Sequence, residues 1–278
     1  NVLLHTARRE KNALQQAREE ARRESRRKTH FPLQWVRDTS RHDSLLFAGY
    51  EAGYKPSEVS GKPRLYYDRR KPWRKRIPYF QYFQPALTVE KPLAYIVPQA
   101  YTEVIERLQW NGIQMQRLAA EQEVEVEMYY IEDFETTDRP YEGHYLHSEV
   151  QVSRDTAVIT VRAGDYLIST DQSGLRYLVE TLEPQAPDSW FSWNFFDGIL
   201  MQKEYFSAYV FEDVAAELLQ KDEALRKALE ARKAEDEAFA KSARAQLEFV
   251  YKRSPWYEPS HRRYPVWRLI KAQDLRVE

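Results

Sequence analysis

The sequence predicts an α+β protein: a small, mostly antiparallel sheet with packed helices, an extended wrap rich in proline and aromatic residues, and a C-terminal helical subdomain. Three patterns support this prediction. Residues 123–130 alternate strictly between two kinds of side chain, which is typical of a half-buried strand. Seven of the 14 prolines lie between Pro56 and Pro98, where few positions can sustain a helix. From residue 188 to residue 252, apolar side chains recur at helical spacing.

Composition divides the chain into four expected segments. The first, residues 1–28, is rich in Ala, Glu, Gln and Arg and contains no Gly or Pro, which indicates a helix solvated on most sides. The chain opens at Asn1 without a methionine or a signal peptide, so we expect a fragment or a processed product of a longer protein. The segments are a linking helix (1–28), the Pro/aromatic-rich extended segment (29–92), an α+β domain (93–187) and the helical C-terminal subdomain (188–278).

The α+β domain has the clearest pattern. Residues 93–97 are apolar and β-prone, which predicts a buried strand. A helix follows Pro98, and Asn111-Gly112 supplies its left-handed stop. Extended chain resumes at residues 113–115, which completes a strand–helix–strand unit.

Further turns and caps follow from residue types. Residues 145–152 alternate as a strand, Arg154-Asp155 is predicted to turn the chain into a third strand, and Gly164-Asp165 to turn it again. Asp171, Asp222 and Asp236 are predicted helix N-caps. The tail from residue 256 to residue 269 is aromatic and is expected to be irregular.

Composition also excludes several classes of function. The absence of cysteine excludes disulfides, cysteine nucleophiles and thiolate metal sites. No uncharged apolar run approaches the ~18 residues of a membrane span. The balance of 42 basic and 43 acidic residues argues against a nucleic-acid partner recognised by overall charge. Nucleotide-binding glycine motifs are absent as well.

Motifs assign no catalytic, cofactor-binding or metal residue. His144 and His147 are weak metal candidates, because residues three apart on a strand point to opposite faces and only a turn at Gly143 would bring the rings together. We interpret them as a strand-edge pair. The chain contains no His-x-x-Glu and no His-Glu-x-x-His motif. The acids Glu123, Glu125 and Glu127 line one strand face, which is typical of solvated side chains.

The stretch from Lys62 to Phe83 combines eight basic residues and one acid with seven interleaved aromatic residues. This composition suits a single-strand nucleic-acid platform. It also suits a loop whose aromatic rings pack inward while its basic groups stay hydrated. We favour the second interpretation because the whole chain is not basic, and binding of an acidic partner surface is the intermediate case.

Several strings, in order, carry a resemblance to a known family. They are residues 50–59 (YEAGYKPSEV), 94–100 (AYIVPQA), 104–108 (VIERL) with 111–112 (NG), 139–144 (RPYEGH), 164–166 (GDY) and 182–189 (LEPQAPDS). Together they resemble the C-terminal region of large bacterial zinc carboxypeptidase-like proteins of the carboxypeptidase A type. The resemblance runs from about residue 31 to residue 269.

The resemblance implies a companion module of a metallocarboxypeptidase. In that family an upstream peptidase domain holds one zinc through a His-x-x-Glu pair and a later His, and a Glu is the general base. No residue here matches those motifs, so zinc is expected only in the missing domain and no cofactor in this chain. The implied partners are that upstream peptidase domain and a peptide substrate, without nucleic acid or a membrane span. The implied location is the periplasm or the extracellular space.

Three functional hypotheses remain open from the sequence. The first is a non-catalytic accessory module of a zinc metallocarboxypeptidase-like protein. The second is a stand-alone peptide- or glycan-binding module that uses exposed Trp and Tyr side chains. The third, a hydrolase that uses carboxylates of the sheet, needs two acids that face each other in a cleft.

Overall fold

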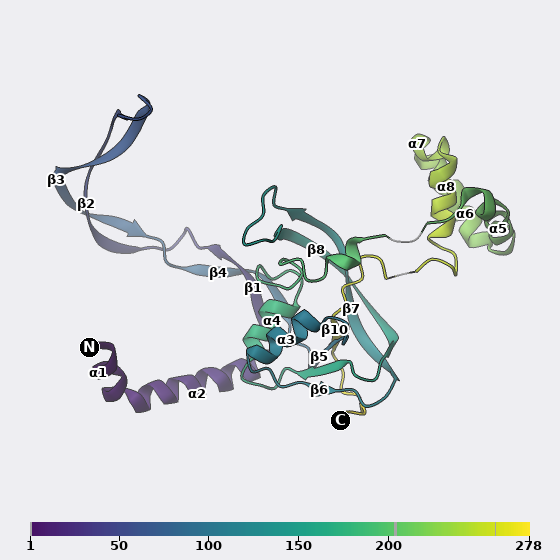
Figure 1. Ribbon diagram of the computed structural model, residues 1–278, viewed down its shortest axis with the longest axis horizontal. Coiled ribbons are helices and arrows are strands. Elements are labelled where there is room, and N and C mark those ends of the chain that lie inside the picture. Colours follow the sequence, from purple (N-terminus) through teal and green to yellow (C-terminus); the bar gives the residue numbers. More distant parts are fainter. Residues whose placement is uncertain (1, 203–204, 259) are drawn as a thin grey trace. The chain divides into compact units, whose positions relative to one another are not determined.

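The computed structural model describes residues 2–202, 205–258 and 260–278 and confirms the α+β class. Contacts divide the chain into two compact units. One unit is Lys28–Lys91, and the other combines Asn1–Arg27 with Pro92–Glu278. Figure 1 labels the helices and strands of both units.

The unit Lys28–Lys91 consists of two antiparallel strand pairs. Strand β1 (His30–Arg37) pairs with β4 (Phe83–Glu90), and strand β2 (Asp43–Pro56) pairs with β3 (Pro63–Tyr79) (Figure 1). The prediction of extended chain in this Pro-rich segment is therefore confirmed. Proline occurs in all four of these strands, each of which has only one ladder partner, so a missing N–H is tolerated on the open side.

The N-terminal residues are helical, as predicted. Helix α1 (Val2–Arg9) and helix α2 (Lys11–Arg27) bury no residue, which fits their thin apolar stripe. Arg26 of α2 forms an ion pair with Asp171, with 3.2 Å between Nε and Oδ1.

Six strands form the sheet of the other unit, in the order β6-β9-β5-β10-β7-β8. All neighbours in this order are antiparallel. The strands are β5 (Ala94–Val97), β6 (Gln116–Arg117), β7 (Gln122–Thr136), β8 (His147–Val161), β9 (Tyr166–Ser169) and β10 (Trp267–Leu269). The predicted strand–helix–strand unit is present as β5, α3 and β6, although β9 lies between the two strands.

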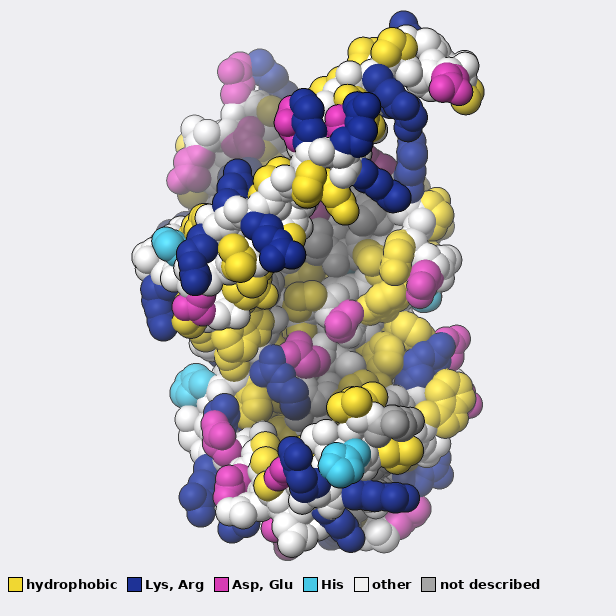
Figure 2. All heavy atoms as spheres, turned by 90° about the vertical axis from the view of Figure 1, so that its left-hand side faces the viewer, with side chains coloured by type: hydrophobic (Ala, Val, Ile, Leu, Met, Phe, Trp, Pro, Cys, Tyr) yellow, Lys and Arg dark blue, Asp and Glu magenta, His cyan; other side chains and the backbone are white. Residues whose placement is uncertain are grey.

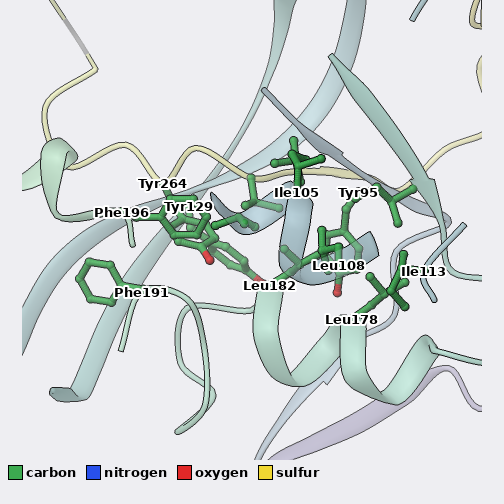
Figure 3. Packing of buried hydrophobic residues seen from close by; sticks show 14 of the residues in the cluster. Tyr95, Ile105, Leu108, Ile113, Tyr129, Leu178, Leu182, Phe191, Phe196 and Tyr264 are labelled. Atoms are coloured by element: carbon green, nitrogen blue, oxygen red, sulfur yellow. The ribbon is translucent and has the colours of Figure 1, made fainter. Parts of the chain in front are cut away.

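Both faces of this sheet are covered. On β5, Tyr95 and Val97 join one apolar cluster while Ala94 and Ile96 join another, as the alternation of a strand requires. Helices α3 (Thr102–Trp110) and α4 (Leu175–Leu182) pack on the first cluster. Figure 3 shows side chains of this cluster from both helices and the sheet, Leu108 and Leu182 among them. The buried strand predicted at residues 93–97 is confirmed.

Three local predictions about the sheet unit are wrong. Strand β8 runs without a turn at Arg154-Asp155, because both residues pair in register with the equally long β7. Helix α4 begins after Gly174 rather than Asp171, and the side chain of Gln172 instead bonds the carbonyl of Ser169 at 2.7 Å. The tail expected to be irregular supplies β10, which lies between β5 and β7.

Residues 188–200 form turns and a 3₁₀ helix, η1 (Asp197–Leu200), so the prediction of helix from residue 188 is wrong there. Phe191 and Phe196 are fully buried in the first cluster, which holds this segment in turns. The helices that follow are α5 (Ala208–Lys221), α6 (Glu223–Glu235), α7 (Glu237–Ala240) and α8 (Ala243–Tyr251).

The helices α5–α8 share an apolar cluster of their own, which includes Phe211, Leu229 and Val250. Asp222 and Asp236 cap α6 and α7 by accepting backbone N–H groups, as predicted. Ser242 caps α8, so the single helix expected after Asp236 is two. Among the described residues, no helix is long and apolar enough to cross a membrane.

Candidate binding site

A pocket of about 660 Å³ opens beside the turns that follow α4, and we call it the aromatic pocket. Its lining comes from α3, α4, the loop before β8 and the segment 188–195. Small-molecule sites typically have volumes of about 300–1,000 Å³ and combine apolar or aromatic side chains with a few polar groups. The lining residues are Arg107, His144, Arg176, Tyr177, Glu180, Thr181, Asp188, Trp190, Trp193 and Phe195.

Aromatic rings form the wall of the pocket. Trp190 meets Phe195 edge-on with 5.0 Å between ring centroids, and Tyr177 meets Trp190 at 6.5 Å. The His144 ring stacks on Phe195 at 5.7 Å and meets Trp193 edge-on at 5.4 Å. Edge-to-face contacts of this kind add stability beyond the area they bury. The rings therefore support one another and present a preformed apolar surface.

Charged groups of both signs stand at the rim. The Arg107 guanidinium lies 4.4 Å from the centre of the Phe195 ring, within cation–π range. Arg176 pairs with Glu180 one turn along α4. Partial burial raises the pKa of Glu180, and the neighbouring Arg176 opposes this shift. Trp193 donates its indole N–H to Asp188 at 3.4 Å.

One polar atom of the wall has no partner. The indole Nε1 of Trp190 is buried and makes no hydrogen bond within the described part of the chain. A buried donor without an acceptor costs about 1–3 kcal/mol. Because this atom is inaccessible to solvent, it does not identify a ligand group.

A smaller hollow of about 290 Å³ shares His144, Trp193 and Phe195 with the aromatic pocket. Its other lining residues include Thr102, Glu103 and Asn194. The three shared rings thus form a ridge between two hollows. This arrangement suits an extended ligand that crosses the ridge rather than a compact one.

A further hollow of about 680 Å³ is lined in part by Tyr257, Glu258 and Ser260. These residues flank residue 259, which lies outside the described part of the chain.

The two predicted metal candidates have different surroundings. His144 follows a turn at Gly143, whose φ is +86°, and its ring lies in the pocket wall. His147 is buried in β8, where its Nδ1 meets Thr136 at 2.9 Å and its Nε2 meets Asp197 at 3.1 Å. Within residues 2–202, 205–258 and 260–278, no three His, Asp or Glu side chains gather as a metal site would require.

The acids of β7 differ from one another. Glu123 is exposed, while Glu125 pairs with Lys271 at 2.6 Å. Glu127 pairs with Arg268, which lies directly opposite on β10 and is only 1% exposed. The expectation that all three are simply solvated is therefore wrong for Glu127.

Arg268 also binds a second acid inside the protein. Its Nε lies 3.0 Å from Glu183, which also accepts the Tyr95 hydroxyl at 2.7 Å. Burial raises the pKa of Glu183 to about 7, and the hydrogen bonds from Tyr95 and Tyr129 oppose the rise. We call Glu127, Glu183, Arg268, Tyr95 and Tyr129 the buried ionic cluster. It joins β5, β7, β10 and the end of α4.

The basic and aromatic stretch 62–83 lies in β3 and the start of β4. Its rings do not pack inward as favoured: Tyr67 is 60% exposed and Phe83 is 55% exposed. Tyr66 and Trp73 are partly covered because they lie over Gly53 and Gly49 of β2. The interpretation of inward packing is therefore wrong for the exposed rings of Tyr67, Tyr79 and Phe83, while the other four rings of the stretch are partly covered.

Sequence reasoning missed the aromatic pocket as a unit. Residues 188–252 were expected to be helical, but residues 190–196 form turns. The contribution of Arg107 and Glu180 depends on how α3 and α4 pack, and no local pattern reveals it. The signal available was the density of Trp and Phe beside Asp188 in a segment without helix-forming residues.

Comparisons with known proteins give a partial match. The chain is 27% identical over 111 residues to Carboxypeptidase 2 of Trichophyton tonsurans and of Trichophyton equinum, and 26% identical to that of Trichophyton rubrum. The match covers 40% of this chain and 20% of each of those proteins. No family model and no solved structure matches the chain. Part of the chain is thus distantly similar to carboxypeptidases.

Proposed function

We propose that this chain is a non-catalytic accessory module of a larger zinc metallocarboxypeptidase-like protein. The observation that carries the proposal is the similarity over 111 residues to Carboxypeptidase 2. The His-x-x-Glu motif of zinc carboxypeptidases does not occur in the sequence. In this proposal, zinc and hydrolysis belong to a separate peptidase domain, and the protein works in the periplasm or outside the cell.

The aromatic pocket gives the module a binding role. The rings of Trp190, Trp193 and Phe195 suit an apolar side chain of a polypeptide. The rim offers Arg107 and Asp188 to groups of opposite charge or to backbone amides. A peptide has both kinds of group at short spacing, and it is long enough to cross the ridge into the second hollow. We therefore propose that the pocket holds a segment of the peptide substrate.

A stand-alone glycan-binding module is the second candidate, and one observation favours it. The Trp193 ring and the Asp188 carboxylate lie side by side, joined by the indole N–H at 3.4 Å. A flat ring beside a carboxylate can hold the apolar face of a sugar and its hydroxyl groups. A binding assay distinguishes the two candidates, because the first requires binding of a peptide and the second requires binding of an oligosaccharide.

Binding is tested by titrating the chain with short peptides and, separately, with oligosaccharides, by calorimetry. Trp193→Ala is expected to weaken peptide binding at least about 10-fold, which is about 1.4 kcal/mol, because the ring separates the two hollows. Trp35→Ala is the matched control, since Trp35 is 53% exposed and lies outside the pocket. If Trp193→Ala and Trp35→Ala bind the peptide with equal affinity, the aromatic pocket is not the peptide-binding site.

Catalysis is tested on the same preparation. The chain is incubated with zinc and a blocked dipeptide that ends in an aromatic residue, and release of the last amino acid is followed. We expect no turnover above that of zinc alone. Zinc-dependent turnover would contradict the non-catalytic role, and tight binding of an oligosaccharide without any peptide binding would favour the second candidate.

A further inference from the structure

The strands β2 and β3 form a long two-stranded ribbon, which we call the arm (residues 43–79). The ladder runs from Asp43 opposite Tyr79 to Pro56 opposite Pro63. No residue of either strand is buried. An isolated two-stranded hairpin is at best marginally stable in water. A ribbon of this length without a core needs another surface to cover it.

The arm is nevertheless built as a defined ribbon. Trp73 lies over Gly49 so closely that a Cβ there would meet the ring at 2.7 Å, and Tyr66 covers Gly53 at 3.1 Å. Aromatic rings over cross-strand glycines fix the register of a sheet. Lys75 lies 4.8 Å from the centre of the Trp73 ring. These contacts lie within the arm, and most of its other side chains remain exposed.

One face near the tip of the arm is apolar and exposed. Ala52 and Tyr54 of β2 face Tyr67 and Leu65 of β3 in the ladder, so all four side chains point to the same side. Tyr54 is 73% exposed and Tyr67 60% exposed. Contiguous exposed apolar groups with polar neighbours mark interaction sites.

The arm is also basic. Residues 43–79 contain nine Lys and Arg and four Asp and Glu, a formal charge of +5. Figure 2 shows basic and hydrophobic side chains side by side over this ribbon, in the upper part of the view. Arg74 and Arg76 follow each other on one face of β3, and neither has an acidic partner within the described residues.

The charge of the whole chain conceals a strong segregation. Residues 92–278 contain 33 acidic and 21 basic residues, a formal charge of −12, although the chain as a whole carries −1. Part of this negative charge lies at one end of the β7–β8 hairpin. Residues 132–149 hold six acids and one arginine, a formal charge of −5. We call this segment the acidic end.

The acidic end is open to a partner. Glu132, Asp133 and Glu135 are exposed near the end of β7, and Glu149 is exposed in β8. None of these four forms an ion pair with Lys or Arg in the part of the chain that the structure describes. Strand β8 is also the last strand of the sheet, so its outer edge has no ladder partner there.

We propose that the arm of one copy of this chain docks on the acidic end of a second copy, and the reverse, in a two-fold dimer. The formal charges of the two surfaces are +5 and −5, and every copy carries both surfaces. Reciprocal contacts of this kind close a dimer and exclude further copies. A nucleic acid is a poorer occupant, because the formal charge of −12 on residues 92–278 opposes the long-range attraction of a polyanion to the chain.

The experiment measures the mass of the intact chain in solution by light scattering after size exclusion. At about 50 mM salt we expect twice the 33.2 kDa of one chain. At about 0.5 M salt we expect a single chain, because exposed charges are screened within a few ångströms. A single chain at both salt concentrations, over the whole accessible protein concentration range, overturns the proposal.

Charge reversal locates the contact. The double variant Arg74→Glu/Arg76→Glu and the double variant Glu132→Lys/Glu135→Lys are each expected to raise the dimer dissociation constant at least about 10-fold. The control Arg226→Glu/Lys227→Glu makes the same change of charge as the arm variant, on exposed positions of α6, and should leave the dimer intact. An equal rise of the dimer dissociation constant in the control would contradict a specific contact between the arm and the acidic end.

Mixing provides the decisive measurement. In an equimolar mixture, the glutamates introduced at positions 74 and 76 of the first variant meet the lysines introduced at positions 132 and 135 of the second. The other contact joins an unmodified arm to an unmodified acidic end. A dimer should therefore form in the mixture although each variant alone stays monomeric. A mixture that stays monomeric while both variants keep the near-ultraviolet circular dichroism of the unmodified chain overturns the proposal. Tight binding of a labelled oligonucleotide to the monomer at physiological salt also overturns it.

Discussion

Glu183 and Arg268 show what a single buried pair adds to this fold. Each is only 1% exposed, and the charged groups are 3.0 Å apart. Burial of two charges is costly, and good geometry with additional hydrogen bonds offsets much of the cost. The Tyr95 hydroxyl and the second acid, Glu127, supply those additional contacts. The pair connects the end of α4 to the middle of the sheet, so it selects one packing of these elements.

The raised pKa of Glu183 makes stability depend on pH. Burial moves this pKa from its ordinary value of 4.5 to about 7, so between these values the folded chain holds a proton that the unfolded chain has released. The contribution of Glu183 to the free energy of unfolding is therefore fully present below about pH 4.5, and it is lost as the pH rises to about 7. The loss is about 3 kcal/mol.

The measurement compares the unmodified chain with Glu183→Gln by urea unfolding from pH 4.5 to pH 7.5. Because glutamine does not titrate, the stability of the variant relative to the unmodified chain should rise by up to about 3 kcal/mol over this range. If the free energy of unfolding changes with pH equally in the two proteins, Glu183 does not hold the additional proton of the folded chain.

At this scale the sequence was a poor guide to the candidate site. His144 attracted attention as a metal ligand, whereas the structure places its ring in an aromatic wall. Trp190 and Trp193 lie in the segment that was expected to be helical from residue 188. Their role depends on Arg107 and Glu180, which are distant in sequence, and only tertiary packing brings such groups together.

Elements fixed by backbone chemistry were predicted well. Gly112 has a φ of +71° at the end of α3, as the Asn-Gly stop requires. Asp222 and Asp236 cap their helices because a short carboxylate reaches the free N–H groups of the first turn. These features depend on two or three neighbouring residues, so the sequence contains all the information.

Elements that depend on distant partners were predicted poorly. Strand β10 has three residues, too few for any periodicity, and it exists because Trp267–Leu269 pairs with β5. The turn expected at Arg154-Asp155 does not form because β7 offers a continuous ladder to β8. Arg154 gains a further contact, 5.4 Å from the centre of the Tyr129 ring. Long-range pairing thus overrides a local turn signal.

The turn between β8 and β9 is a test of backbone chemistry. Gly164 has a φ of +91°, and an added Cβ would lie 2.8 Å from the Gln99 side chain. Gly164→Ala should therefore lower the free energy of unfolding by about 1 kcal/mol or more. Gly198→Ala is the control, since Gly198 has open space around it and no positive φ. Equal thermal midpoints for the two variants would contradict this account of the turn.

At the scale of the whole molecule, the two units differ in how they are stabilised. The unit with residues 92–278 has two apolar clusters around its sheet and a third among helices α5–α8. In the unit Lys28–Lys91 the arm has no buried residue. The sequence predicted the extended character of residues 29–92 from proline and aromatic density. It did not predict a ribbon of two paired strands, because so many aromatic rings were expected to pack inward.

This difference predicts unequal hydrogen exchange along the chain. Local opening of the arm breaks its ladder without exposing a core, whereas opening of β5 requires the buried clusters to separate. Amides of β2 and β3 in monomeric chain at about 0.5 M salt should exchange at least about 100-fold faster than those of β5 and β10. Mass spectrometry of peptic fragments measures both sets in one sample. Equal protection would show that the arm is covered within the monomer, and the need for an external partner would then disappear.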